Sequence, residues 1–127
     1  MTKKTILYIE DTADNRDLVT QILETEYAVH TAVNGEEGIA LARALQPDLI
    51  LMDISLPVMD GLTCTRHLRE DPQLRGVPVV ALTAHCMVGD RERALAAGCD
   101  DFLSKPFRFA QLRGLVATMI ARGPRGG

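Results

Sequence analysis

The sequence lacks several residue types and patterns that mark particular classes of protein. Its 127 residues include no tryptophan, only two tyrosines and only three phenylalanines. The cysteines Cys64, Cys86 and Cys99 are an odd number without a C-x-x-C spacing, which argues against a disulfide framework and a zinc site; we expect small buried side chains. No apolar run approaches the length of a membrane span, and the N-terminal "MTKKTILYIED" has no signal-peptide core. These absences predict a cytoplasmic protein.

The sequence also lacks a large excess of charge of one sign. A formal net charge of -3 gives no electrostatic reason to bind the phosphate backbone of a nucleic acid or an anionic membrane. With 46% hydrophobic and 24% charged residues, the composition is that of a folded globular protein. The length suits one domain, predicted over residues 1–121. The remaining "RGPRGG" (122–127) has too little apolar surface to pack, so we expect a disordered tail.

Short apolar runs alternate along the chain with longer segments of helical periodicity. The third and fourth runs are apolar at successive positions, as expected of parallel strands that helices cover on both faces. We therefore predict an α/β protein with a doubly wound arrangement, βα repeated five times, and with Gly98 as the left-handed cap of the fourth helix. The five predicted strands are residues 5–9, 28–33, 48–53, 77–83 and 101–105.

Polar residues end four of the five predicted strands. Ligands of an open parallel sheet bind beyond the carboxyl ends of its strands, where the winding direction reverses. A strand order of 2-1-3-4-5, which right-handed crossovers allow, places the reversal between the first and third strands and puts the second strand at an edge. The residues expected to converge are Glu10, Asp11, Asp53, Thr83 and Lys105.

Each of these residues has a plain structural alternative. Glu10 and Asp11 would favour the start of the first helix, and Asp53 could simply be a turn residue. Thr83 suits a strand end or a helix cap, and Lys105 suits the solvated surface. These alternatives do not predict that all five residues should meet at one edge of the sheet. The joint pattern therefore favours a functional site.

Three clustered carboxylates repel one another unless one keeps a proton or a hard cation lies among them. Mg2+ fits such a site because it takes oxygen ligands, keeps several waters and accepts a phosphate oxygen. A lysine ammonium and a threonine hydroxyl nearby suit the other oxygens of a phosphoryl group. An aspartate can be the nucleophile of phosphoryl transfer, and Asp53, alone on its strand, is the favoured acceptor.

The motifs "ILYIEDTADNRDL", "PDLILMDISLPVMDG", "VPVVALTAH" and "GCDDFLSKPF" resemble, in this order and spacing, the receiver domain of two-component response regulators. The resemblance covers residues 5 to about 121 and extends to single-domain chemotaxis-type regulators and to receivers of hybrid histidine kinases. It implies a flavodoxin-like fold, a phosphoryl group on Asp53, and phosphoryl oxygens bound by Thr83 and Lys105. The implied ligands of Mg2+ are Glu10, Asp11, Asp53 and the backbone carbonyl of Ser55.

The resemblance further implies a switch and a set of partners. In this family the threonine moves toward the phosphoryl group while an aromatic side chain three residues before the lysine, here Phe102, changes rotamer. Ser55 and His85 occupy positions that tune phosphate hydrolysis, and Lys105-Pro106 resembles a cis peptide of the family. The expected donor is a histidine kinase or a histidine phosphotransfer protein.

We expect the output to be another protein or a further relay step, because no DNA-binding or catalytic domain follows. A whole small bacterial protein is the first interpretation, and a receiver excised from a hybrid kinase is the alternative. We expect a monomer, or a weak dimer through the face around the fifth strand and last helix. Three of the few aromatic residues lie there: Phe102, Phe107 and Phe109.

Three rival functions use similar features. A phosphatase of the haloacid dehalogenase type also has a strand-end aspartate and Mg2+, but it needs a second aspartate where this chain has Ser55. A flavin or nucleotide module would need a glycine-rich loop after the first strand, where this chain reads "EDTADN". A receiver used only as an unphosphorylated protein-binding scaffold would not need the intact acceptor site.

Overall fold

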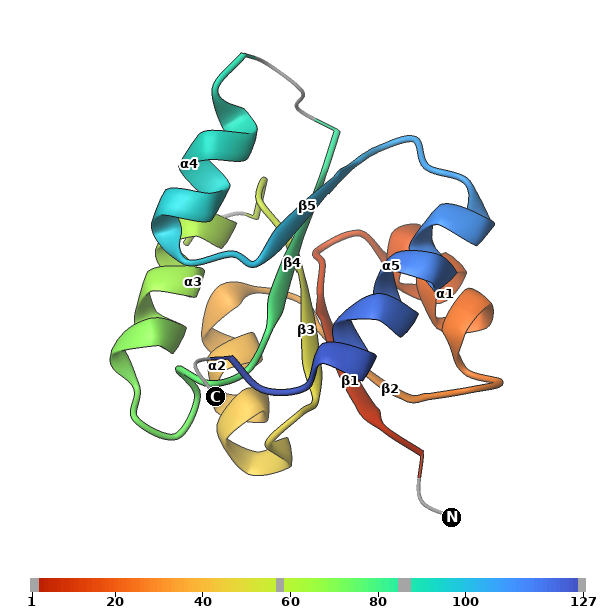
Figure 1. Cartoon of the computed structure of the whole chain (residues 1–127), viewed down its shortest axis with the longest axis horizontal. Coiled ribbons are helices and arrows are strands. Elements are labelled where there is room, and N and C mark those ends of the chain that lie inside the picture. The colour runs from red at the N-terminus through yellow and green to blue at the C-terminus, as the bar shows by residue number, and fades with distance from the viewer. Residues whose placement is uncertain (1–2, 57–58, 85–87, 126–127) are drawn as a thin grey trace.

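The structure is a computed structural model and describes residues 3–56, 59–84 and 88–125. Within these residues strands and helices alternate along the chain (Figure 1). The strands are β1 (Thr5–Ile9), β2 (Ala28–Ala32), β3 (Leu49–Asp53), β4 (Val79–Thr83) and β5 (Asp101–Ser104). The helices are α1 (Ala13–Leu23), α2 (Gly35–Leu45), α3 (Gly61–Glu70), α4 (Asp90–Ala97) and α5 (Phe109–Arg122).

The strands are parallel and pair in the order β2-β1-β3-β4-β5, which confirms the predicted fold class and strand order. Four of the predicted strands extend one or two residues beyond the observed ones. At β4 the cause is Pro78, which has no N–H for the ladder, although its carbonyl accepts the amide of Ile50 at 2.9 Å. At the other end of the sheet, the amide of Lys105 donates to the carbonyl of Thr83 at 2.7 Å.

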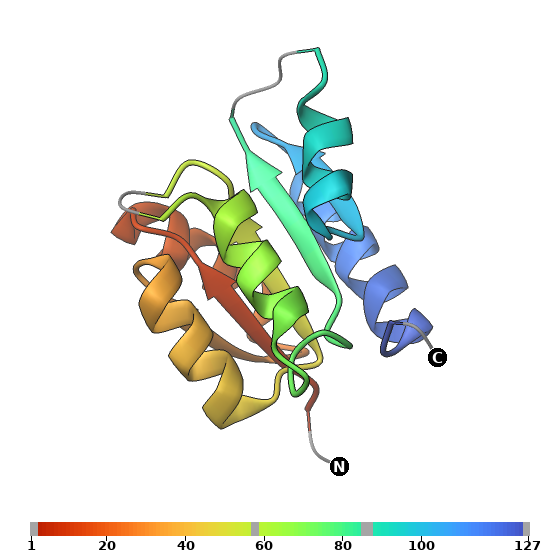
Figure 2. The ribbon, with the colours of Figure 1, turned by 90° about the vertical axis from the view of Figure 1, so that its left-hand side faces the viewer.

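Helices cover both faces of the sheet, as the two perpendicular views show (Figure 1 and Figure 2). Residues of β1 alternate between two buried clusters. Ile6 and Tyr8 join the cluster under α1 and α5, whereas Leu7 and Ile9 join the cluster under α2, α3 and α4. All residues of β3 and β4 are buried. Burial on both faces explains why these strands are apolar at successive positions.

The helix ends follow local sequence signals. The side chain of Asn34 caps α2 by accepting from the amide of Glu37 at 2.8 Å, and Asp60 caps α3 in the same way. Gly98 ends α4 with φ 114°, which confirms the predicted left-handed cap. Thr12 is the N-cap residue of α1, but its side chain makes no capping hydrogen bond.

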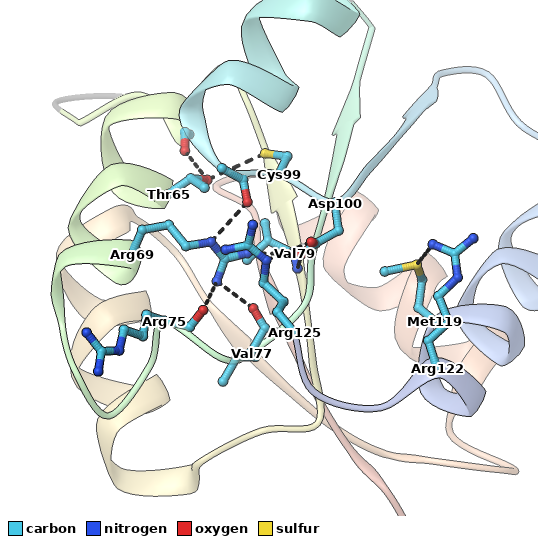
Figure 3. A network of polar contacts seen from close by, with 12 residues as sticks. Thr65, Arg69, Arg75, Val77, Val79, Cys99, Asp100, Met119, Arg122 and Arg125 are labelled. Carbon is cyan, nitrogen blue, oxygen red and sulfur yellow. Dashed lines mark hydrogen bonds and ion pairs between the residues drawn. The ribbon is translucent and has the colours of Figure 1, made fainter. Parts of the chain in front are cut away.

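An arginine network joins α3 to the amino ends of β4 and β5, at the edge of the sheet opposite the carboxyl ends of the strands (Figure 3). Arg69 Nε donates to the Gly98 carbonyl at 3.0 Å, and Arg69 Nη1 donates to the Val77 carbonyl at 2.6 Å. Arg69 Nη2 donates to Asp100 Oδ2 at 3.0 Å. One side chain therefore satisfies partly buried carbonyls in the segments that lead into β4 and β5.

The C-terminal segment is anchored in part. Helix α5 continues to Arg122, one residue beyond the predicted domain boundary, and Arg125 Nε donates to Asp100 Oδ1 at 2.8 Å. The amide of Arg125 also donates to the carbonyl of Gly76 at 2.8 Å. Arg125 is therefore attached to the rest of the domain, contrary to the expectation of an unpacked tail. The attachment consists of an ion pair and a backbone hydrogen bond, neither of which requires apolar surface.

The structure bears on two expectations from the sequence, those about the cysteines and about membrane-spanning helices. Cys64 and Cys99 are buried free thiols, as predicted, and Cys86 lies outside the described residues. Burial raises the pKa of Cys64 to about 12. None of the described helices combines the length and the apolarity that crossing a bilayer requires.

Candidate functional site

The carboxyl ends of β1, β3, β4 and β5 bring the predicted site residues to one edge of the sheet. Glu10 and Asp11 directly follow β1, Asp53 and Thr83 are the last residues of β3 and β4, and Lys105 directly follows β5. Glu10, Asp11 and Asp53 each offer a carboxylate oxygen within 4.8 Å of the others. Lys105 Nζ lies 3.1 Å from Glu10 Oε2 and 4.0 Å from Asp53 Oδ2. The expected convergence is therefore observed for Glu10, Asp11, Asp53 and Lys105, and Thr83 ends the strand that pairs with β3.

Burial differs sharply among the three carboxylates. Glu10 is 1% exposed and Asp53 is 6% exposed, whereas Asp11 faces solvent. Thr83 is fully buried at the end of β4. A cation in this cluster would therefore be open to water on the Asp11 side and enclosed by protein on the Glu10 side.

The carboxylate of Glu10 accepts hydrogen bonds on both oxygens. Oε2 accepts from the Tyr8 hydroxyl and from Lys105 Nζ, both at 3.1 Å. Oε1 accepts from the amide of Thr12 at 3.2 Å and from Asn15 Nδ2 at 3.4 Å. These four donors explain how a charged group can lie almost completely inside the protein.

The carboxylate of Asp53 is held by the loop that follows β3. Asp53 Oδ1 accepts from the amide of Ser55 at 2.9 Å. Gly61, the first residue of α3, donates its amide to the Ile54 carbonyl at 2.9 Å, so α3 begins directly against this loop. A Cβ atom at Gly61 would lie 2.4 Å from the carbonyl oxygen of Asp53, so only glycine fits this approach.

The pKa values of the two buried carboxyl groups are shifted in opposite directions. Burial, together with the hydrogen bond shared with Glu10, raises the pKa of Asp53 to about 6. Burial also disfavours ionised Glu10, but its hydrogen bond with Asp53 and the nearby Lys105 ammonium lower its pKa to about 2. The Lys105 ammonium lies closer to Glu10 than to Asp53, and this difference favours the ionised form of Glu10.

The remaining predicted site residues are Ser55, Phe102 and His85. Ser55 has an exposed side chain, and Phe102 is half-buried against the core under α2, α3 and α4. His85 lies outside the described residues. The Lys105-Pro106 peptide bond is cis, as predicted.

Sequence reasoning missed Tyr8 and Asn15, which both donate to Glu10. A tyrosine inside an otherwise aliphatic strand was the available signal, since a buried tyrosine hydroxyl usually has a polar partner. Burial and the Glu10 carboxylate raise the pKa of Tyr8, so its hydroxyl keeps its proton at neutral pH.

The sequence model of the response regulator receiver domain matches residues 6–117. The chain belongs to this family of receiver domains. It is 43% identical over 104 residues to the polar-differentiation response regulator DivK of Brucella anthropi, covering 81% of this chain and 85% of that protein. It is 42% identical over 115 residues to hybrid signal transduction histidine kinase G of Dictyostelium discoideum, covering 87% of this chain but only 3% of that kinase.

Solved receiver structures have the same fold. The receiver domain of a sensor histidine kinase from Pseudomonas aeruginosa superposes with a TM-score of 0.87 at 37% identity, covering 94% of this receiver and 99% of that chain. That structure has a magnesium ion coordinated in its active site cleft. A CheY-like receiver from Methanospirillum hungatei superposes with a TM-score of 0.88 at 27% identity, covering 95% and 96% of the two chains. The predicted family and flavodoxin-like fold are confirmed.

Proposed function

We propose that this receiver accepts a phosphoryl group on Asp53 from a phosphohistidine of a histidine kinase or a histidine phosphotransfer protein. A carboxylate oxygen of Asp53 attacks phosphorus, and the P–N bond breaks as the new P–O bond forms. The bonding electron pair stays on the histidine nitrogen, and the ring leaves as neutral imidazole when its other nitrogen carries a proton. The observation that carries the proposal is the meeting of Asp53, two further carboxylates and Lys105 at one edge of the sheet.

Mg2+ fits the carboxylate cluster on chemical grounds. Three oxygen donors lie within reach of one ion, and Asp11 leaves one side open to water, as a magnesium ion that keeps several waters requires. The proposed holders are Glu10, Asp11, Asp53 and the backbone carbonyl of Ser55. The bound ion would supply positive charge that keeps the carboxylates ionised and balances the phosphoryl oxygens.

Lys105 and Thr83 are the proposed contacts of the phosphoryl oxygens. The Lys105 ammonium lies between the carboxylates, 3.1 Å from Glu10 and 4.0 Å from Asp53, so a small rotation carries it toward a phosphoryl oxygen on Asp53. Thr83 ends the neighbouring strand β4 and is the proposed donor to a second oxygen. Phosphoryl transfer mainly requires groups that balance the negative charge on the three phosphoryl oxygens.

The proposed output is a change of the surface around β5. Thr83 and Phe102 lie on neighbouring strands, and movement of Thr83 toward the phosphoryl group would bias the rotamer of Phe102. Ser55 and His85 are proposed to tune hydrolysis of the phosphoryl group. The cytoplasmic location, the protein target and a weak dimer through β5 and α5 stay predictions.

Intact mass spectrometry after incubation with acetyl phosphate and Mg2+ tests the proposal. Wild type should gain one phosphoryl group, whereas Asp53→Asn and a sample with chelated metal should gain none. Asp17→Asn, at an exposed position of α1, is the matched control and should be labelled like wild type. Failure of wild type to be labelled by acetyl phosphate and by a phosphohistidine protein would favour the unphosphorylated scaffold.

A further inference from the structure

The Tyr8 hydroxyl and the Lys105 ammonium share one oxygen of Glu10. Both lie 3.1 Å from Oε2. Tyr8 is fully buried on β1, and Glu10 is 1% exposed, so water has little access to this oxygen. A buried carboxylate oxygen that loses its donors carries the full cost of its lost hydration.

The shared oxygen matters because Lys105 has two tasks in the proposed function, on which this inference rests. Before phosphorylation its ammonium is closer to Glu10 than to Asp53. When a phosphoryl group is present on Asp53, the ammonium must turn toward it and lengthen its contact with Glu10. Glu10 Oε2 then depends on the remaining donor, the hydroxyl of Tyr8.

We propose that Tyr8 is a positioning residue that keeps Glu10 Oε2 hydrogen-bonded while Lys105 moves to the phosphoryl group. The hydrogen bond that the Tyr8 hydroxyl donates goes to Glu10 and not to the acceptor carboxylate. It acts by lowering the free-energy cost of releasing Lys105 from Glu10. Among the described residues, Tyr8 and Lys105 are the two that donate to Oε2, so Tyr8 is the donor that stays when Lys105 turns away.

The effect of Tyr8→Phe on binding of the phosphoryl group should depend on the presence of Lys105. In Tyr8→Phe, Oε2 accepts a hydrogen bond from Lys105 before the phosphoryl group binds and from neither described donor afterwards. Mg2+ held by Glu10 would be present in both states and would not replace the lost hydrogen bond, so binding becomes weaker. In a Lys105→Met background, Tyr8→Phe removes the same hydrogen bond from both states, so binding should not change further. A double-mutant cycle isolates this pairwise dependence.

The experiment measures affinity for the beryllium trifluoride anion, a tetrahedral mimic of the phosphoryl group that bonds to a carboxylate oxygen. It uses saturating Mg2+ with wild type, Tyr8→Phe, Lys105→Met and the double variant. Tyr8→Phe should weaken anion affinity about tenfold, the usual scale for one hydrogen bond to a charged group, and Mg2+ affinity without the anion less than about threefold. Tyr27→Phe, at a half-buried tyrosine before β2, is the matched control and should behave like wild type.

Three outcomes would overturn the inference. The first is an unchanged anion affinity in Tyr8→Phe. The second is an equal loss of affinity for Mg2+ and for the anion, or a loss that is the same with and without Lys105, because either result indicates a purely structural role. The third is a wild type that binds Mg2+ but never the anion; only this outcome also contradicts the proposed function.

Discussion

Replacing Gly61 by alanine should destabilise the protein and displace the acceptor loop. Gly61 begins α3 directly against the end of β3. An added Cβ would lie 2.4 Å from the carbonyl oxygen of Asp53 and 2.7 Å from the Cα of Ile54. Both are backbone atoms, so no side chain can rotate away from the new methyl group.

The expected loss of stability follows from these distances, and Gly114 provides a matched comparison. Ordinary contact for a Cβ begins near 3.4 Å, so the start of α3 and the end of β3 must separate by about 1 Å. Overpacking of this kind costs about 1–3 kcal/mol. Gly114 lies inside α5 with nothing within 4 Å of an added Cβ, so Gly114→Ala should instead stabilise by about 0.5–1 kcal/mol.

Urea unfolding of the two variants beside wild type measures these free energies. The unfolding midpoint should fall for Gly61→Ala and rise for Gly114→Ala, and the free energies of unfolding of the two variants should differ by about 1.5–4 kcal/mol. Labelling of the folded Gly61→Ala by acetyl phosphate should also be slower, because the backbone of Asp53 has moved. A Gly61→Ala variant with the stability and labelling rate of wild type would refute the reasoning.

Three further predictions concern charge and burial. The pKa of Asp53 is raised to about 6 in the folded metal-free protein, so folding stability in chelator should fall as pH rises from about 4 to 6, and Asp53→Asn should flatten this dependence of the urea midpoint. Arg69→Met should cost about 3 kcal/mol because it removes one partner of a largely buried ion pair with Asp100 and the donor to two partly buried carbonyls, whereas Arg125→Met, at a more exposed partner, should cost about 1 kcal/mol or less; urea unfolding compares them. Cys64 should resist alkylation until the protein unfolds, because burial raises its pKa to about 12; peptide mapping after timed alkylation checks this.

The sequence was sufficient for the fold class, the strand order and the identity of the converging residues. Apolar runs at successive positions indicate strands covered on both faces, and polar residues at their ends indicate the working edge of a parallel sheet. Asp53 could be singled out because it ends an otherwise aliphatic strand. Gly98 could be recognised as a helix end because a glycine after a helical segment readily adopts the left-handed conformation that ends a helix.

Other features needed the tertiary structure because they depend on distances between distant parts of the chain. Position alone does not reveal that Glu10 is almost fully buried while Asp11 is exposed, or that Tyr8 and Lys105 share one oxygen of Glu10. The attachment of Arg125 to Asp100 was missed for the same reason, since composition predicts apolar packing but not a charge pair between segments 25 residues apart. Local patterning determined which residues meet at the edge of the sheet, and three-dimensional packing decided which of them are buried, charged and paired.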